Sequence, residues 1–144
     1  MRTAYKCRAY PDHEQASVLN RTFGSVRVAW NRTLAWRQAR YRGDRAPTSY
    51  AQANAHLTAM KATAELGWLN EVSSVPLQQA LRHQQAAFSG FFAGRASYPR
   101  YKSRTGRQSA EYTRSGFRYR DGQLLLAKMS TPLAFAWSDR KSVV

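Results

Sequence analysis

This 144-residue chain has few acidic residues, a single cysteine and no long apolar run. Eight Asp and Glu stand against 23 Lys and Arg, which gives a formal net charge of +15 at pH 7. Cys7 alone can form neither an internal disulfide nor a zinc site. No stretch of about 18 apolar residues predicts a membrane span, and residues 1–6 lack the apolar centre of a signal peptide. We therefore expect a cytoplasmic protein that does not associate with membranes.

The sequence also lacks any arrangement typical of a catalytic centre. Its acids are scattered over helix starts, turns and loops, at Asp12, Glu14, Asp44, Glu65, Glu71, Glu111, Asp121 and Asp139. No spacing among them indicates metal binding or acid–base catalysis. The three histidines lie on separate predicted helices, and no Ser-His-Asp arrangement, glycine-rich phosphate loop or CxxC motif is present. We expect a protein that is not an enzyme and holds no metal or cofactor.

Positive charge interleaved with aromatic rings is what the chain has in abundance. The basic-aromatic segment, residues 95–120, contains a single acid, Glu111. Its cations and rings are Arg95, Tyr98, Arg100, Tyr101, Lys102, Arg104, Arg107, Tyr112, Arg114, Phe117, Arg118, Tyr119 and Arg120. Cations pair with phosphates and flat rings stack on bases, so the segment favours nucleic acid as partner. The alternative is a solvated charged surface with no partner.

Periodicity predicts a strand followed by helices. Residues 3–10 alternate, with Cys7 on the same face as Tyr5 and Ala9, so Cys7 is expected to be buried. Pro11-Asp12-His13-Glu14 begins a helix that ends near Gly43-Asp44. Its apolar stripe comprises Leu19, Phe23, Val26, Trp30 and Leu34. The opposite face comprises Arg21, Arg27, Arg32, Arg37 and Arg40, which are expected to face solvent.

Two further helices are expected before the basic-aromatic segment. Thr48 or Ser49 caps the first, whose core face contains Tyr50, Ala53, Leu57 and Met60; Trp68-Leu69 then looks like a core plug. Ser73-Ser74 with Pro76 just inside predicts the start of the next helix, and Gly94 its end. Because the loops are short, the helices should pack as an antiparallel bundle.

The last third of the chain returns to strand periodicity. Asp121-Gly122 predicts a hairpin turn between two short strands. Residues 133–137 predict a further strand, with which we expect the first strand of the chain to pair. The fold class is therefore α+β, with a helical lobe inserted between strands.

A second candidate surface is the helix start Ser73–Leu81. Serines at a helix N-terminus can hold phosphate, and Gln78 or Gln79 could read adenine in a major groove. The alternative, which sequence alone favours, is an N-capped amphipathic helix with a polar outer face.

Four motifs in register give the chain a family resemblance. They are Tyr5-Lys6 with Arg8-Ala9-Tyr10-Pro11 and Glu14-Gln15; Phe23-Gly24-Ser25-Val26-Arg27 with Trp30-Asn31; Trp68 through Leu81; and Phe88 with Phe91-Phe92 and Tyr98-Pro99-Arg100-Tyr101-Lys102. From about Thr3 to Trp137 the order and spacing resemble the start of TnpB proteins, the OrfB group of the IS200/IS605 and IS607 elements. The family consists of RNA-guided DNA nucleases.

The resemblance implies an architecture and partners. It implies an incomplete wedge-like partial β-barrel at residues 1–11 and 96–144, interrupted by a helix-turn-helix-like recognition lobe at residues 12–95. The expected partners are guide-like RNA from the transposon end and the DNA duplex that flanks the target. The family's RuvC-like nuclease domain and four-cysteine zinc ribbon are missing, so we expect a truncated, non-catalytic fragment. The tail from Ser138 to Val144 does not resemble the family's continuation.

Candidate nucleic-acid-binding residues follow from both arguments. By resemblance, the residues that would read the DNA motif flanking the target are Tyr50, Asn54, Ser74, Val75, Gln78 and Thr113. Lys6, Arg8, Arg27 and Asn31 lie in the first two motifs, and Arg100, Lys102, Arg104 and Arg107 lie in the basic-aromatic segment. Two alternatives remain: a stand-alone helix-turn-helix DNA-binding regulator, and a non-functional pseudogene product. The oligomeric state is not predicted.

Overall fold

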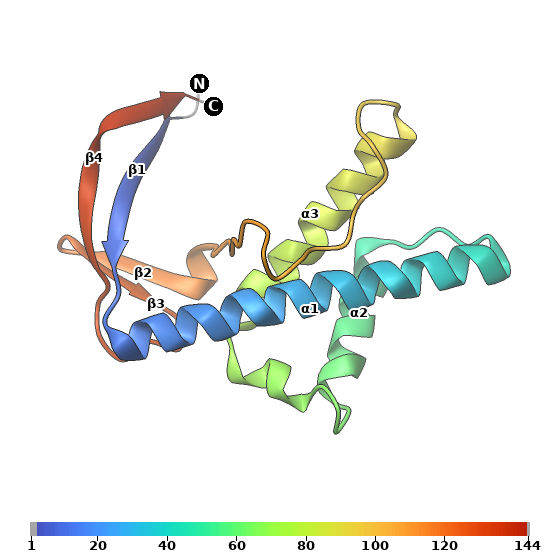
Figure 1. Cartoon of the computed structure of the whole chain (residues 1–144), viewed down its shortest axis with the longest axis horizontal. Coiled ribbons are helices and arrows are strands. Elements are labelled where there is room, and N and C mark those ends of the chain that lie inside the picture. Colours follow the sequence, from blue (N-terminus) through green and yellow to red (C-terminus); the bar gives the residue numbers. More distant parts are fainter. Residues whose placement is uncertain (1–2, 144) are drawn as a thin grey trace.

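The computed structural model describes residues 3–143 of the chain, with side chains described for residues 4–137 (Figure 1). The elements are β1 (Thr3–Tyr10), α1 (His13–Asp44), α2 (Tyr50–Lys61), η1 (Gly67–Glu71), α3 (Ser74–Phe92), η2 (Arg114–Gly116), β2 (Phe117–Arg120), β3 (Gln123–Leu126) and β4 (Ala134–Val143). The α+β class is confirmed. Residues 1, 2 and 144, which the predicted wedge includes, lie outside the described residues.

Side-chain caps begin the three long helices. Asp12 caps α1: its carboxylate accepts from the Gln15 N–H at 2.8 Å, and the Gln15 side chain accepts from the Asp12 N–H at 3.0 Å. Ser49 and Gln52 form the same reciprocal box at the start of α2. Ser73 caps α3 by accepting from the Val75 N–H. The predicted starts of all three helices are therefore confirmed to within a few residues.

The core lies where the three helices cross. It is built by small and aliphatic side chains that are almost fully buried, namely Ala29, Leu34, Ala53, Leu57, Leu69, Leu77 and Leu81. Figure 1 shows α2 and α3 crossing the long α1 steeply, so the predicted antiparallel bundle is not the observed arrangement. The small residues Ala29 and Ala53 suit this geometry, because helices that cross need a close approach only where they meet.

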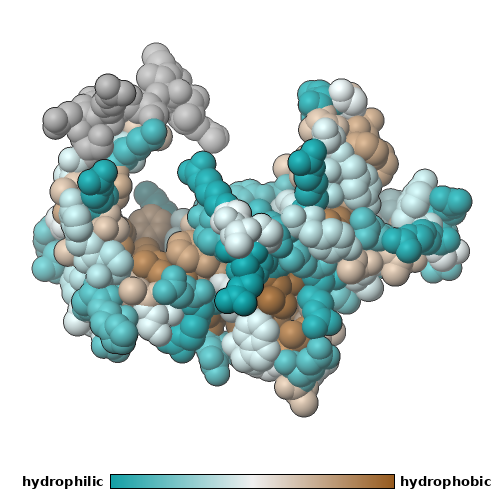
Figure 2. Space-filling model, viewed as in Figure 1, coloured by the Kyte–Doolittle hydropathy of each residue, from teal (hydrophilic) through white to brown (hydrophobic). Residues whose placement is uncertain are grey.

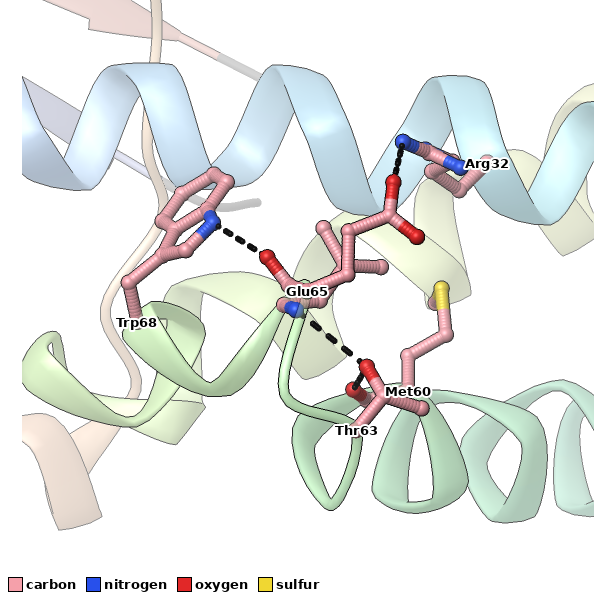
Figure 3. Close-up of polar contacts among 6 residues, drawn as sticks. Arg32, Met60, Thr63, Glu65 and Trp68 are labelled. Atoms are coloured by element: carbon pink, nitrogen blue, oxygen red, sulfur yellow. Dashed lines mark hydrogen bonds and ion pairs between the residues drawn. The ribbon is translucent and has the colours of Figure 1, made fainter.

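The turn from α2 into η1 is fixed by a short polar network (Figure 3). Arg32 of α1 forms an ion pair with Glu65 at 2.9 Å. The Trp68 indole donates to the Glu65 carbonyl at 3.0 Å, and the Thr63 hydroxyl accepts from the Leu66 N–H at 3.2 Å. Leu69 is fully buried as predicted, but the Trp68 side chain is 42% exposed. Trp68 lies outside the core because its N–H is satisfied within the turn itself.

The strands form two separate antiparallel ribbons, β1–β4 and β2–β3. β1 pairs with β4 from Thr3 opposite Val143 to Tyr10 opposite Ala134, which confirms the expected pairing of the first and last strands. The chain from 138 to 143 continues β4, beyond the predicted strand. The β2–β3 turn is the predicted hairpin, with Asp121 at φ 53° and Gly122 at φ 76°.

No closed barrel is present among residues 3–143, which corrects the barrel part of the predicted fold. Only one isolated bridge, between Leu124 and Leu133, connects the two ribbons. A two-stranded ribbon covers neither of its own faces, and for this reason Cys7 is exposed instead of buried. Gln15 attaches this region to the start of α1, because its amide donates to the Thr131 and Pro132 carbonyls at 3.0 Å.

None of the described helices has both the length and the apolar character that a membrane crossing requires.

Candidate nucleic-acid interface

The basic-aromatic segment is held against α1 by its backbone. The Trp30 indole donates to the Arg100 carbonyl at 2.8 Å. The Asn31 amide donates to the Lys102 carbonyl at 2.9 Å and accepts from the Lys102 N–H at 2.8 Å. Figure 1 shows the segment descending beside α3 and crossing α1. These three bonds use main-chain groups of the segment, so they leave its cationic side chains free to point outwards.

A tight turn follows at residues 103–108, organised by one side chain. The Gln108 amide donates to the carbonyls of Ser103, Arg104 and Gly106 at 2.8–3.3 Å. Its oxygen accepts from the Arg27 guanidinium at 3.3 Å. Arg27, one of the predicted site residues, therefore contacts the turn directly and positions it.

The predicted cations of this segment face solvent without carboxylate partners. Arg100, Arg104 and Arg107 are exposed, and none of them takes part in the three ion pairs found among the described side chains. Lys102 differs, since its ammonium lies 4.4 Å from the centre of the Trp30 ring. Glu111, the single acid of the segment, lies 2.6 Å from His83 of α3. The segment thus presents an unneutralised row of guanidinium groups.

A second group of predicted residues lies on facing sides of α2 and α3. Tyr50 and Asn54 are four residues apart on α2, and Ser74 and Gln78 are four apart on α3, so each pair shares a helix face. Arg82, one turn beyond Gln78, lies over the Tyr50 ring at 4.1 Å. The structure therefore brings the two faces together through Arg82, a residue that the sequence analysis missed although its spacing from Gln78 is helical.

Val75 and Thr113 meet the same surface from the η2 side. Val75 is buried, and a Cβ added at Gly116 would lie 3.0 Å from its side chain. Close packing of Gly116 on Val75 places η2 against the first turn of α3. Thr113 is exposed directly before η2, with its hydroxyl 3.1 Å from that of Ser115. Val75 thus supports the surface by packing, and Thr113 lies at its edge.

Lys6 and Arg8 lie on the β1–β4 ribbon, where both are exposed. The same ribbon has a cluster of rings that sequence reasoning did not assemble: Trp137 lies 6.2 Å from Tyr5, 5.0 Å from Phe135 and 6.4 Å from Tyr119 between ring centroids. Trp137 is 56% exposed. Cross-strand register could have found the pair of Tyr5 and Trp137 once β1 was paired with the last strand.

His56 of α2 packs against an aromatic ring of α1. His56 stacks on Trp36 at 4.1 Å between ring centroids, and burial lowers the pKa of its imidazole. Over the described part of the chain, no three His, Cys, Asp or Glu side chains gather as metal ligands would.

Comparison with known proteins shows what the chain is similar to. Residues 1–45 match the helix-turn-helix domain model of the IS605 OrfB group. The chain is 55% identical over 139 residues to a putative RNA-guided DNA endonuclease of Streptomyces pristinaespiralis, covering 96% of this chain and 35% of that protein. It is 32% identical over 101 residues to the putative RNA-guided DNA endonuclease InsQ of Escherichia coli K12, covering 70% of this chain and 25% of InsQ. Residues 1–45, which the structure forms as β1 and α1, are thus similar to the helix-turn-helix domain of the IS605 OrfB group, and the chain spans about a third or less of the length of these two relatives.

Proposed function

We propose that this chain is a nucleic-acid-binding module of a TnpB-like protein that contacts guide-like RNA and the DNA duplex flanking the target. In this proposal residues 12–95 form the recognition lobe, and residues 1–11 with 96–144 form the wedge part. We do not propose that these residues cleave DNA. The exposed thiol of Cys7 suits a reducing compartment, so we place the protein in the cytoplasm.

The observation behind the proposal is the anchored row of unpaired cations in the basic-aromatic segment. Three bonds from Trp30 and Asn31 fix its backbone, while Arg100, Arg104 and Arg107 stay exposed without acids. Fixing the backbone costs conformational entropy during folding and not during binding, so the main chain that presents the cations is ordered before a polyanion binds. A net charge of +15 draws DNA or RNA towards this surface over about a Debye length.

Reading of the flanking duplex is assigned to the α2–α3 faces. Gln78 and Asn54 can make bidentate contacts to adenine, and Arg82 can contact guanine, from a helix that lies in a major groove. Ser74 in the first turn of α3 can donate to phosphate beside the helix N-terminus. Tyr50 is held by the Arg82 guanidinium, which fixes the position of both groups.

Salt dependence tests the electrostatic part. Affinity for a labelled duplex, measured by fluorescence anisotropy over a salt series, should fall linearly on a log–log plot. The triple variant Arg100→Gln, Arg104→Gln, Arg107→Gln should reduce the slope by about 2 to 3, because each phosphate contact contributes about 0.9.

The matched control removes three charges from α1 instead, as Arg21→Gln, Arg32→Gln, Arg42→Gln. Two of those arginines already pair with Glu71 and Glu65, so the slope should change much less. If both triple variants reduce the slope equally, only net charge matters and the proposed interface is wrong.

Sequence preference tests the α2–α3 faces. Gln78→Ala should weaken binding to the preferred duplex by about tenfold and narrow the difference between sequences, as loss of one bidentate contact predicts. Gln79→Ala is the control, because this neighbour is the same residue type on a different side of α3. A preference that is unchanged in Gln78→Ala would contradict the assignment.

A further inference from the structure

A second site lies at the other end of the helices, away from the first turn of α3. A hollow of about 380 Å³ opens between the C-terminal halves of α1 and α3 and the loop at residues 46–48. We call it the Arg37 pocket; its main lining residues are Arg37, Tyr41, Phe88, Phe91, Phe92 and Tyr98. Figure 2 shows hydrophobic residues along the flank of the projecting end of α3, beside the notch that separates it from α1. The volume is in the range of small-ligand sites.

Arg37 is a buried cation without a carboxylate. The residue is only 6% exposed, although sequence periodicity places it on the solvent face of α1. Its guanidinium donates to the Thr48 carbonyl at 3.3 Å and to the Gln85 side-chain oxygen at 2.8 Å. Both acceptors are neutral, and the buried Nε–H has no acceptor. Burial lowers the pKa of Arg37, but an arginine stays protonated at neutral pH.

A buried charge with neutral partners alone is unfavourable, and an anion in the pocket would compensate it. The guanidinium carbon lies 4.9 Å from the centre of the Phe88 ring, so Arg37 is held against an aromatic wall. No acid of the described residues forms an ion pair with it. The pocket therefore favours a ligand with negative charge at this end.

The opposite wall favours a flat apolar ligand. Phe91 lies 5.1 Å from Tyr98 and 5.2 Å from Phe92 between ring centroids, both at steep interplanar angles. Phe92 is 73% exposed, so one of its ring faces is open to a ligand. Bases of single-stranded nucleic acid stack on such rings, whereas bases in a duplex are already stacked and paired.

Position along the chain connects the pocket to the basic-aromatic segment. Tyr98 lines the pocket, Pro99 is buried, and Arg100 begins the row of exposed cations. Tyr101 is also fixed nearby, because its hydroxyl donates to Gln38 of α1 at 2.7 Å. A nucleic-acid strand that runs along the cations from Arg107 to Arg100 therefore reaches the mouth of the pocket.

We propose that the Arg37 pocket binds one unpaired nucleotide of a single-stranded nucleic acid, with its base on the Phe91–Phe92–Tyr98 wall and its phosphate towards Arg37. This rests on the proposed nucleic-acid binding and adds to it a site for one splayed-out base. The site is separate from the Arg100, Arg104 and Arg107 row and from the α2–α3 faces.

The test compares single-stranded with duplex binding in variants of the full chain. Phe92→Ala should weaken binding of a short labelled single strand by about tenfold, as expected for one lost stacking contact, with duplex affinity unchanged. Tyr10→Ala, an exposed ring at the end of β1, is the control and should leave single-strand affinity unchanged. Equal affinities of Phe92→Ala and the unmodified chain for the single strand would overturn the proposal.

A mononucleotide titration separates this proposal from the wider one. AMP, followed by NMR of the pocket resonances, should bind more tightly than adenosine, and Phe92→Ala should weaken both. Arg37→Gln should remove the preference for AMP, while Arg37→Lys, which retains the charge, should keep part of it. Adenosine binding as tightly as AMP would overturn the role of Arg37. AMP binding that persists in the Arg100, Arg104, Arg107 triple variant, while its salt slope falls, would support the pocket as a site separate from that row.

Discussion

Single side chains of α1 determine where the basic-aromatic segment lies. Asn31 is the clearest case, since one amide satisfies both the N–H and the carbonyl of Lys102. An asparagine on the outer face of a helix has no need of such partners, because water is available there. We infer that its role is to fix the segment, and that its loss acts on binding indirectly through the order of the cations.

Asn31→Leu tests this inference. The variant keeps the side-chain size but loses both bonds, so stability should fall by about 1–2 kcal/mol. Amide hydrogen exchange at Lys102 should speed up, because its N–H donates only to Asn31. Asn20→Leu, at an exposed position of α1, is the control and should leave Lys102 exchange unchanged. Unchanged exchange in Asn31→Leu would contradict the anchoring role.

His56 predicts a pH dependence of stability. Burial holds its pKa below the ordinary value of about 6.5, so the unfolded chain takes up the proton more readily than the folded chain. Stability contributed by the neutral ring is complete above about pH 6.5 and is lost as the pH falls from there towards the folded pKa. His56→Phe keeps a flat ring against Trp36 and has no titrating group.

Thermal unfolding between about pH 7.5 and pH 5 measures this contribution. The unmodified chain should lose more melting temperature across that interval than His56→Phe. Parallel curves for the two proteins would mean that His56 contributes nothing to the acid sensitivity of the fold.

Among the elements, those with local signals are the ones that sequence predicts. Ser49 and Ser73 caps, the start of α1 at Asp12 and the Asp121-Gly122 turn depend on neighbouring residues, and each is confirmed. Burial at Cys7 and exposure at Arg37 depend on distant chain, and both predictions are wrong. Arg37 is buried because Phe88 and Gln85 of α3 and Thr48 of the loop surround it. The periodicity of α1 alone cannot predict these contacts with other elements. The same holds for the candidate site. Its row of cations can be predicted from the sequence, whereas the role of Arg82 and the Arg37 pocket can be recognised only once the crossing of the helices is known.

Two glycines distinguish backbone strain from helix propensity. Gly122 has φ 76° in the β2–β3 turn, and Gly43 is in the last turn of α1; a Cβ added at either meets no atom within 4 Å. Gly122→Ala should therefore destabilise by about 1 kcal/mol through the left-handed conformation alone. Gly43→Ala should stabilise by up to about 1 kcal/mol, because alanine is the better helix former.

Urea unfolding of the two variants measures both effects, and the opposite signs make the pair its own control. Equal destabilisation would mean that the turn conformation at Gly122 costs alanine no more than a helical position does.

At the scale of the whole molecule, charge sets both stability and binding. The net charge of +15 is spread over 144 residues with three ion pairs among the described side chains, so the folded chain repels itself. Salt screens this repulsion, and the same screening reduces the gain from releasing counterions of DNA or RNA. A higher salt concentration should therefore raise the stability of the fold and lower its affinity for nucleic acid.

Raising sodium chloride from about 20 mM to about 200 mM should increase the melting temperature of the free chain. It should also decrease the affinity of the chain for duplex or structured RNA by about 10⁵-fold or more if six or more phosphates are contacted. Scanning calorimetry and anisotropy on the same samples measure the two changes. The Arg100, Arg104, Arg107 triple variant should show a smaller effect of salt on both, since it removes cations from the surface where they are most crowded. A melting temperature that falls with salt would mean that the three ion pairs outweigh the self-repulsion. It would also mean that the cations of the basic-aromatic segment do not destabilise the free chain.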